Sequence, residues 1–211
     1  MHTEGFDRQR WAALCRRLGC PDAVQNFEAL RVAYAQPHRH YHDVRHIAEC
    51  LALFDELRDD CDHPDEVEYA IWMHDVVYEP RRSDNEARSA YLAVAWLAPC
   101  DVDGPVLQRV RNLVLATRHD GAPATRDEEI IVDIDLHILG ADADRFDEYE
   151  AQVRREYRRV PWFLYRRRRA DILRGFLARV PLYRTERCRA RSEERARANL
   201  RRSIERLTGR A

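Results

Sequence analysis

Lysine is missing from the 211 residues, so all 36 basic side chains are arginines. The 37 acidic residues nearly balance them and leave a net charge of −1. This balance excludes the strong global positive charge of a general nucleic-acid-binding protein, although local patches remain compatible with it. We interpret the absence of lysine as a compositional bias of a GC-rich genome.

Glycine is scarce, with seven residues, and the chain shows no strand-like alternation of apolar and polar residues. Both features argue against a β-sandwich or a Rossmann sheet. Alanine, leucine, arginine and glutamate are abundant, which favours an all-helical fold. With 45% hydrophobic residues, the chain is long enough for one domain with a substantial core.

Three further absences bear on the expected cellular location and on the state of the cysteines. No apolar run approaches the roughly 20 residues that a membrane span needs, and the N-terminus lacks the apolar core of a signal peptide. None of the six cysteines forms a Cys-x-x-Cys pair with a histidine partner, which argues against a zinc ribbon or a thioredoxin motif. We therefore expect a cytoplasmic protein with reduced thiols and no membrane partner.

Helical periodicity and capping signals predict about nine helices in a compact all-α domain over 1–211, with a core of about 25–180 and a helix 186–207 packed on it. Ser83 and Glu86 form an expected capping box, and Asp127 an expected N-cap. The expected helices cover 6–18, 22–35, the segment after Asp43, 64–79, 83–97, 105–117, 127–139, the segment after Asp142, 162–180 and 186–207.

The stretch IWMHDVVYEP at 71–80 places two ionisable side chains in an apolar segment that reads as helix. Spacing of i, i+4 and i+7 puts His74 on one face with Val67 and Ile71, and Asp75 lies at the edge of that stripe. An inward histidine is more often satisfied within a core than a metal ligand, so this site needs support from elsewhere in the chain.

A second polar side chain in an apolar stripe comes from IIVDIDLHIL at 130–139. Asp135 shares a helical face with Ile131 and Ile134, whereas Asp133 falls on the other side and is expected to face solvent. Because an isolated buried carboxylate costs several kcal/mol, Asp135 requires a partner.

The third site is His46, which shares a face with Cys50 in the helix after YHDVRH. The three inward sites would offset one another's cost by converging on one divalent cation held by His46, His74, Asp75 and Asp135. Two imidazoles and two carboxylates suit Mn²⁺, Fe²⁺, Ni²⁺ or Zn²⁺, and Mg²⁺ is a further candidate. Such a cation would make water acidic enough to act as a nucleophile near neutral pH.

The order His46, His74-Asp75, Asp135 resembles the H…HD…D signature of the HD superfamily of metal-dependent phosphohydrolases. The segments RHYHDVRHI, WMHDVVYEPRRSDNEARSA, DIDLHILGA and LYRTERCRARSEERARANL resemble one subgroup of it, over about residues 25–207. The resemblance implies an all-α HD fold, these four residues as metal ligands and phosphohydrolase activity. It does not supply a substrate.

The resemblance also bears on two further histidines. In some HD proteins, histidines from the region of His119 hold a second metal or contact phosphate. Alternatively, His119 has only a local role, in which its positive charge interacts favourably with the C-terminus of the preceding helix. For His42, in the loop before His46, we favour contact with a metal ligand or with substrate.

The segment that follows His74-Asp75 contains four candidate catalytic residues. Asp84 and Glu86 resemble the acidic residues that act as general bases in helical hydrolases of alarmone nucleotides, but Glu86 has a capping role, so Asp84 is the better candidate. Arg81 and Arg82 present guanidinium groups that match phosphate oxygens, or they form an ordinary solvated loop.

Two other segments attract attention in the C-terminal third. The four arginines at 166–169 are expected on a solvated helix face. The aromatic residues of VPWFLY at 160–165 are expected to pack in the core, in preference to stacking on a nucleobase.

The leading hypothesis is a metal-dependent phosphohydrolase that acts on a small phosphate ester or nucleotide. Its catalytic residues would be Asp75, Asp84, Arg81, Arg82 and His119. The alternatives are a metal-stabilised binding or regulatory module without turnover and, less favoured, a di-iron oxygenase. The oligomeric state is not readable from the sequence.

Overall fold

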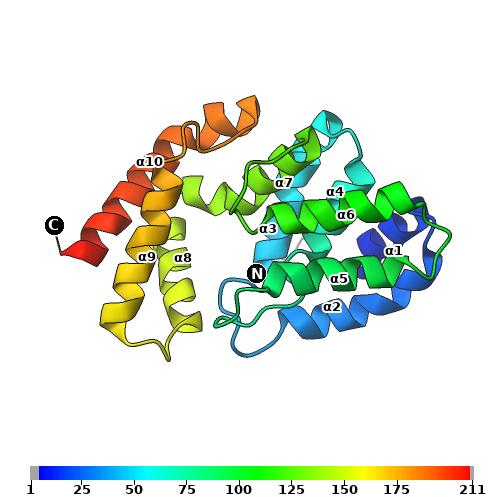
Figure 1. Ribbon diagram of the computed structural model, residues 1–211, viewed down its shortest axis with the longest axis horizontal. Coiled ribbons are helices and arrows are strands. Elements are labelled where there is room, and N and C mark those ends of the chain that lie inside the picture. Colours follow the sequence, from blue (N-terminus) through cyan, green and yellow to red (C-terminus); the bar gives the residue numbers. More distant parts are fainter. Residues whose placement is uncertain (1–4, 210–211) are drawn as a thin grey trace. The chain divides into compact units, whose positions relative to one another are not determined.

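Residues 5–209 are described by the structure, a computed structural model, and contain ten α-helices and no β-strand (Figure 1). The all-α prediction is confirmed: the ten α-helices lie in the ten segments expected to be helical, so the expected number of about nine was one too low. The chain forms two compact units, Met1–Ile134 and Asp135–Ala211. The single domain expected over 1–211 stays a prediction. None of the described helices combines the length and apolar character that a membrane crossing requires.

The first unit contains seven α-helices and two short 3₁₀ segments within its described part. The α-helices are α1 (Arg8–Arg17), α2 (Phe27–Tyr34), α3 (Val44–Leu57), α4 (Pro64–Met73), α5 (Asn85–Leu97), α6 (Gly104–Ala116) and α7 (Arg126–Asp135), whose last residue opens the second unit. The 3₁₀ segments are η1 (Pro21–Asn26) and η2 (Arg58–Asp60).

Helix α4 is the centre of this unit, because it packs against α1, α3, α5 and α6. All its residues from Glu66 to Met73 are buried. Trp11 of α1 stacks on Tyr69 with ring centroids 5.5 Å apart and meets Trp72 edge to face. The end of α4, which carries the predicted metal-binding pair, is therefore fixed by a well-packed core.

The buried Glu68 of α4 links three segments through ion pairs. Its carboxylate accepts hydrogen bonds from Arg10 of α1 at 2.7 Å, from Arg17 of α1 at 2.8 Å and from Arg58 of η2 at 2.9 Å. A buried carboxylate is tolerated where such charged donors satisfy its oxygens.

The second unit consists of a 3₁₀ segment and three α-helices: η3 (Leu136–Gly140), α8 (Ala143–Glu156), α9 (Trp162–Leu177) and α10 (Glu186–Thr208). Helices α9 and α10 pack along each other, and α10 also covers η3. The buried Arg169 of α9 pairs with Glu150 of α8, whose other oxygen accepts from Ser203 of α10 at 2.8 Å. The carboxylate of Glu150 thus links all three helices, through an ion pair to α9 and a hydrogen bond from α10.

Gly140 permits the close approach of η3 to α10. A Cβ atom at this position would lie 2.6 Å from Cβ of Ser192, closer than such atoms come. The carbonyl groups at the end of η3 are satisfied by α10: Arg195 donates to Gly140, and Asn199 donates to Leu139 and Ala141, at 2.9 Å in each case.

Several local predictions are wrong. Helix α4 ends at Met73 rather than just before Pro80. Asp84, not Ser83, occupies the N-cap position of α5. Asp127 lies inside α7, where its carboxylate accepts the backbone N–H groups of Asp62 and His63.

The expectation of reduced thiols is also wrong for one pair. Cys20 and Cys100 form a disulfide with their Cα atoms 5.2 Å apart, within the range that disulfides require. Cys15, Cys50, Cys61 and Cys188 are free thiols.

Candidate metal centre

His46 is presented by the first turn of α3. The side chain of Asp43 caps this helix by accepting from the N–H groups of Arg45 at 2.8 Å and of His46 at 3.4 Å. The imidazole of His46 is fully buried, as its position on the apolar face predicts. A capped helix start holds the ring in one place.

His74 and Asp75 lie at the point where α4 ends. His74 is the C-cap residue, and its N–H still donates to the carbonyl of Ala70 at 2.8 Å. Asp75 follows in the turn after the helix. Neighbours on a regular helix point about 100° apart, whereas here both side chains reach one point.

Three donor atoms from these residues lie close together. Nε2 of His46 is 3.1 Å from Nε2 of His74, and Oδ2 of Asp75 is 3.6 Å and 3.2 Å from these two nitrogens. Ligands bound at about 2.1 Å are about 3.0 Å apart along an octahedral edge and about 3.4 Å apart in a tetrahedron. The three residues therefore form a group that could hold a metal ion.

The protonation of these side chains suits a cation. Nδ1 of His74 lies 2.9 Å from the carbonyl of Ile71, so its N–H donates there and Nε2 presents a lone pair. Burial by itself raises the pKa of Asp75, but the electrostatic interaction and hydrogen bond with His74 and the neighbouring imidazoles of His42 and His46 outweigh it. The pKa of this carboxyl is held well below its usual range, so Asp75 presents an ionised carboxylate.

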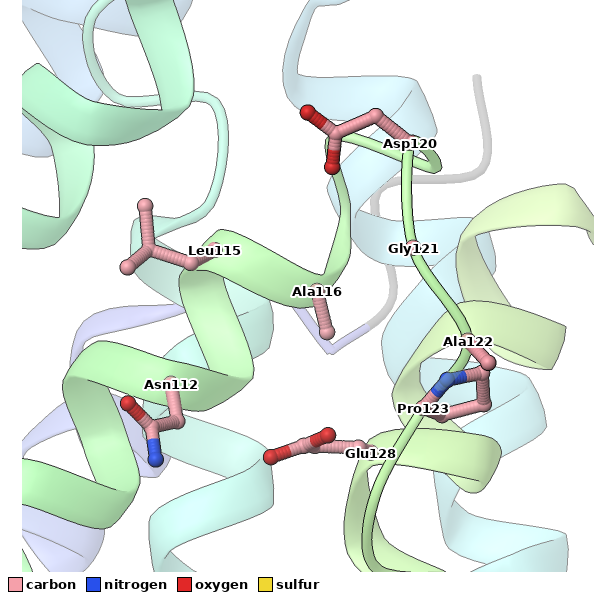
Figure 2. A pocket seen from close by; sticks show the side chains of 8 residues that line it. All are labelled: Asn112, Leu115, Ala116, Asp120, Gly121, Ala122, Pro123 and Glu128. Atoms are coloured by element: carbon pink, nitrogen blue, oxygen red, sulfur yellow. The ribbon is translucent and has the colours of Figure 1, made fainter.

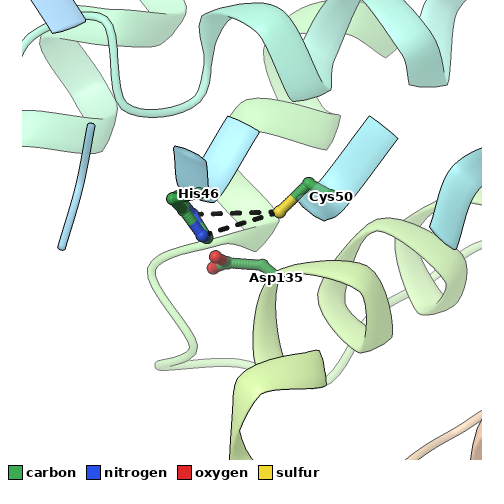
Figure 3. A group of neighbouring side chains, drawn as sticks. All are labelled: His46, Cys50 and Asp135. Carbon is green, nitrogen blue, oxygen red and sulfur yellow. Dashed lines mark hydrogen bonds between the residues drawn. The ribbon is translucent and has the colours of Figure 1, made fainter. Parts of the chain in front are cut away.

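Cys50, one turn after His46, adds a thiol to this region. Its Sγ lies 3.7 Å from Nδ1 and 3.9 Å from Nε2 of His46, and its S–H donates to the carbonyl of Ile134 at 3.9 Å. Figure 3 shows His46 and Cys50 on α3, and Asp135 at the end of α7. Cys50 is therefore a candidate metal-binding side chain that was not predicted from the sequence, although it lies on the same helix face as His46.

Asp135 and Asp133 differ from their predicted exposure. Asp135, the last residue of α7, is only partly buried, whereas Asp133 is fully buried rather than solvent-facing. The prediction failed because α7 is enclosed on more than one side, with Ile130, Val132 and Ile134 also buried.

Aromatic rings pack around His46. His42 stacks on Tyr78 with ring centroids 4.2 Å apart, and its ring centroid lies 5.9 Å from that of His46. Tyr41 packs against His46 at 4.8 Å. His42 thus lies beside a candidate ligand, as expected, and its contact with substrate stays a prediction.

Arg39 was not recognised in the sequence and proves central to the site. Its buried guanidinium donates to the carbonyls of His42 at 2.9 Å, Asp75 at 2.7 Å and Val76 at 3.0 Å. It joins the loop before α3 to the turn after α4, and so positions two of the segments next to the candidate metal-binding group. No periodic pattern marks such a residue, because three of its four hydrogen bonds go to backbone carbonyls and only one, at 3.2 Å, goes to a side chain, that of Gln36.

The loop after the HD pair is exposed. Arg81, Arg82 and Asp84 all lie at the surface, and Arg82 forms a double hydrogen bond to Asp84, with both N···O distances 2.6 Å. The hydrogen bond from Arg82 lowers the pKa of Asp84, which makes this carboxylate a weaker base. The predicted catalytic roles of the three residues stay predictions.

His119 follows the end of α6 with a backbone φ of 58°, in the left-handed region. A pocket of about 210 Å³ lies next to it, between α6 and the loop that leads to α7. Figure 2 shows Asn112 of α6 facing Glu128 of α7 across this pocket, with Asp120 at the loop. The lining contains none of the three grouped donors, so the pocket is separate from the candidate metal centre.

Comparisons with protein-family models, with curated proteins and with solved structures found no match to this chain. What the protein does must therefore be inferred from its own side chains.

Proposed function

We propose that this protein is a metal-dependent phosphohydrolase of small phosphate esters or nucleotides, with His46, His74, Asp75 and Asp135 as the metal ligands. The observation that carries the proposal is the approach of three donor atoms from α3 and the end of α4 to within 3.6 Å of one another. Two imidazoles and an ionised carboxylate fit a divalent transition metal.

Asp135 completes the proposed ligand set on grounds of sequence position. It directly follows Ile134, whose carbonyl accepts a hydrogen bond from Cys50, one turn after His46 on α3. The H…HD…D order of the four residues is consistent with this assignment.

A bound divalent cation would polarise a phosphoryl oxygen and supply hydroxide at neutral pH. The chain's own residues prepare for this chemistry. The hydrogen bond to Ile71 fixes the tautomer of His74, and neighbouring charges keep Asp75 ionised. His42, beside His46, is suitably placed to contact a phosphate oxygen or to hold a proton.

The two arginines of the exposed loop differ in whether an acidic side chain already pairs with them. Arg82 is engaged by Asp84, whereas Arg81 forms no ion pair within residues 5–209. We therefore assign phosphate contact to Arg81 in preference to Arg82. Asp84, with its lowered pKa, is a poor candidate for the general base.

Metal analysis of the purified protein, followed by a hydrolysis screen of mono-, di- and cyclic nucleotides and sugar phosphates, tests the proposal. Asp75→Asn should lose both metal and turnover. Asp55→Asn is the matched control, because Asp55 is an exposed carboxylate paired with Arg10. Equal hydrolysis by wild type and Asp75→Asn would mean that the activity comes from a contaminant.

A second candidate function follows from the donor set within the first unit. Two histidines and one carboxylate are also the ligands of Fe²⁺ in many oxygenases. Iron-loaded protein that consumes dioxygen but releases no phosphate from the panel would favour that candidate. Metal-loaded protein with neither activity would point to a binding module.

A further inference from the structure

The N-terminal turn of α9 carries an exposed apolar tip, defined as Trp162, Phe163 and Leu164. These side chains are 53%, 63% and 50% exposed, against the prediction that this segment packs in the core. Only Tyr165 of the segment's aromatic residues is buried. Large exposed apolar side chains next to one another are typical of interaction sites.

The tip surrounds the end of the helix instead of forming a stripe along it. Three consecutive residues cover about 200° of the helix circumference, at about 100° each. The inward face of α9 consists of other residues: Tyr165, Arg169, Ala170 and Leu173 are buried. The tip is thus extra apolar surface that the fold of this unit does not use.

Six exposed arginines flank the tip in the chain. They are Arg155, Arg158, Arg159, Arg166, Arg167 and Arg168. Within residues 5–209 none of the six forms an ion pair with an acidic side chain, and between 155 and 168 the single acidic residue, Glu156, is buried. Nearby exposed acids are already paired, as Asp171 is with Arg174.

We propose that this surface docks on an anionic lipid bilayer, with the tip inserted at the level of the headgroups and the six arginines against the lipid phosphates. The combination of aromatic and aliphatic side chains with flanking cations is the chemistry of interfacial membrane anchors. The sequence-based expectation of no membrane partner considered spanning segments only. Docking of this kind needs no spanning helix and is independent of the proposed metal centre.

Two other occupants fit less well. A second copy of the same surface would bring twelve guanidinium groups together, which electrostatic repulsion opposes. Single-stranded nucleic acid would need open ring faces for stacking. Trp162 instead lies over Tyr165 with ring centroids 5.9 Å apart and beside the guanidinium of Arg154 at 5.6 Å, and Leu164 has no ring to offer. Of the three tip residues, Phe163 alone presents an open ring, whereas a strand needs a series of stacking rings.

Co-sedimentation of the full chain with vesicles tests the proposal. Binding is expected with phosphatidylcholine vesicles that contain about 30% phosphatidylserine, and should weaken with added salt and with phosphatidylcholine alone. The variant Trp162→Ser/Phe163→Ser/Leu164→Ser should bind about tenfold more weakly. The variant Arg166→Gln/Arg167→Gln/Arg168→Gln should also bind more weakly and depend less on salt.

Matched controls come from the first unit. Val32→Ser/Tyr91→Ser removes exposed apolar side chains, and Arg8→Gln/Arg16→Gln/Arg111→Gln removes exposed arginines, so neither should change binding. A second measurement keeps an aromatic side chain at the tip: brominated lipids should quench the fluorescence of wild type more than that of Trp162→Phe. Trp11 and Trp72 are fully buried and should not respond, and the partly buried Trp96 of the first unit remains in both proteins.

The proposal is overturned if wild type fails to bind the anionic vesicles at low salt, or if the control variants lose binding as strongly as the tip variant. It is also overturned if bromination quenches wild type and Trp162→Phe equally. Binding to a single-stranded oligonucleotide that the tip variant abolishes, without vesicle binding, would replace the bilayer with nucleic acid as the partner.

Discussion

Nε2 of His46 lies 3.1 Å from Nε2 of His74, although both rings are buried. Because the N–H of His74 is committed to the carbonyl of Ile71, its Nε2 presents a lone pair to the other ring. Two imidazole nitrogens in this position, with Asp75 beside them, need a proton or a cation between them.

Removal of metal should therefore lower stability. A ligand present at about 100 times its dissociation constant adds about 2.7 kcal/mol to the free energy of unfolding. We expect a chelator to lower the melting temperature of wild type and to leave that of His46→Gln/His74→Gln unchanged. His63→Gln, at a partly exposed histidine paired with Asp127, is the control that should keep the response. An unmoved wild-type melting curve contradicts the metal centre.

Replacement of Arg39 should loosen the site. Arg39→Met leaves the carbonyls of His42, Asp75 and Val76 without their donor in a buried place, and we expect a loss of about 3 kcal/mol in unfolding free energy. Arg39→Lys should recover part of that stability but still bind metal more weakly, since one ammonium cannot reproduce the planar fork. Arg31→Met, at an exposed ion pair, is the control for both.

The two carboxylates at the end of α7 should behave differently. Asp135→Asn should reduce metal content with little change in melting temperature, because the partly exposed side chain keeps its size. Asp133→Asn should lower the melting temperature with or without chelator, because this fully buried carboxylate has partners whose hydrogen bonds or charges a neutral amide would not match. Metal loss in the Asp133 variant alone would reverse the assignment.

Arg81→Ala and Arg82→Ala should separate in kinetics. Loss of a phosphate-contacting arginine costs about 2–4 kcal/mol of transition-state stabilisation, so kcat/KM should fall by a factor of about 30 to 10³ in Arg81→Ala. Arg82→Ala should retain most activity, because its guanidinium is engaged by Asp84. Metal content should be unchanged in both, and the opposite order of effects would assign the contact to Arg82.

Acid should weaken the hydrogen bonds that hold the segment before α10, at Leu182 and Tyr183, to Glu193. Burial raises the pKa of Glu193, but hydrogen bonds from the N–H groups of Leu182 and Tyr183 and from Arg197 outweigh it, and the net pKa is lowered. A lowered folded-state pKa adds stability above the ordinary glutamate pKa of about 4.3, and this is lost as pH falls through the folded value. Melting curves of Glu193→Gln should be lower at pH 7 and converge on wild type in acid.

The helices were predictable because their signals are local. The apolar spacing of His46 and His74 and the cap at Asp43 lie within a few residues of the features that they determine. The errors concern tertiary surroundings. Whether Asp133 or Asp135 is buried depends on what covers α7, and the exposure of Trp162 depends on α9 presenting another face to its neighbours.

The role of Arg39 and the Cys20–Cys100 disulfide could not be predicted from the sequence for a related reason. A guanidinium that binds backbone carbonyls leaves no side-chain pattern, and a disulfide across 80 positions follows only from the path of the chain. The H…HD…D order nevertheless directed attention to three side chains that the structure brings together.

The disulfide also closes a covalent ring. Residues 20–100 form a loop that contains His46, His74 and Asp75, and the helices α3 and α4 with them. A protease that nicks the exposed segment around Arg81 would cut the chain but not separate its pieces. The fragments should migrate together until a reducing agent is added, because the disulfide would keep the fragment that carries α3 and α4 covalently attached to the fragment that follows the nick.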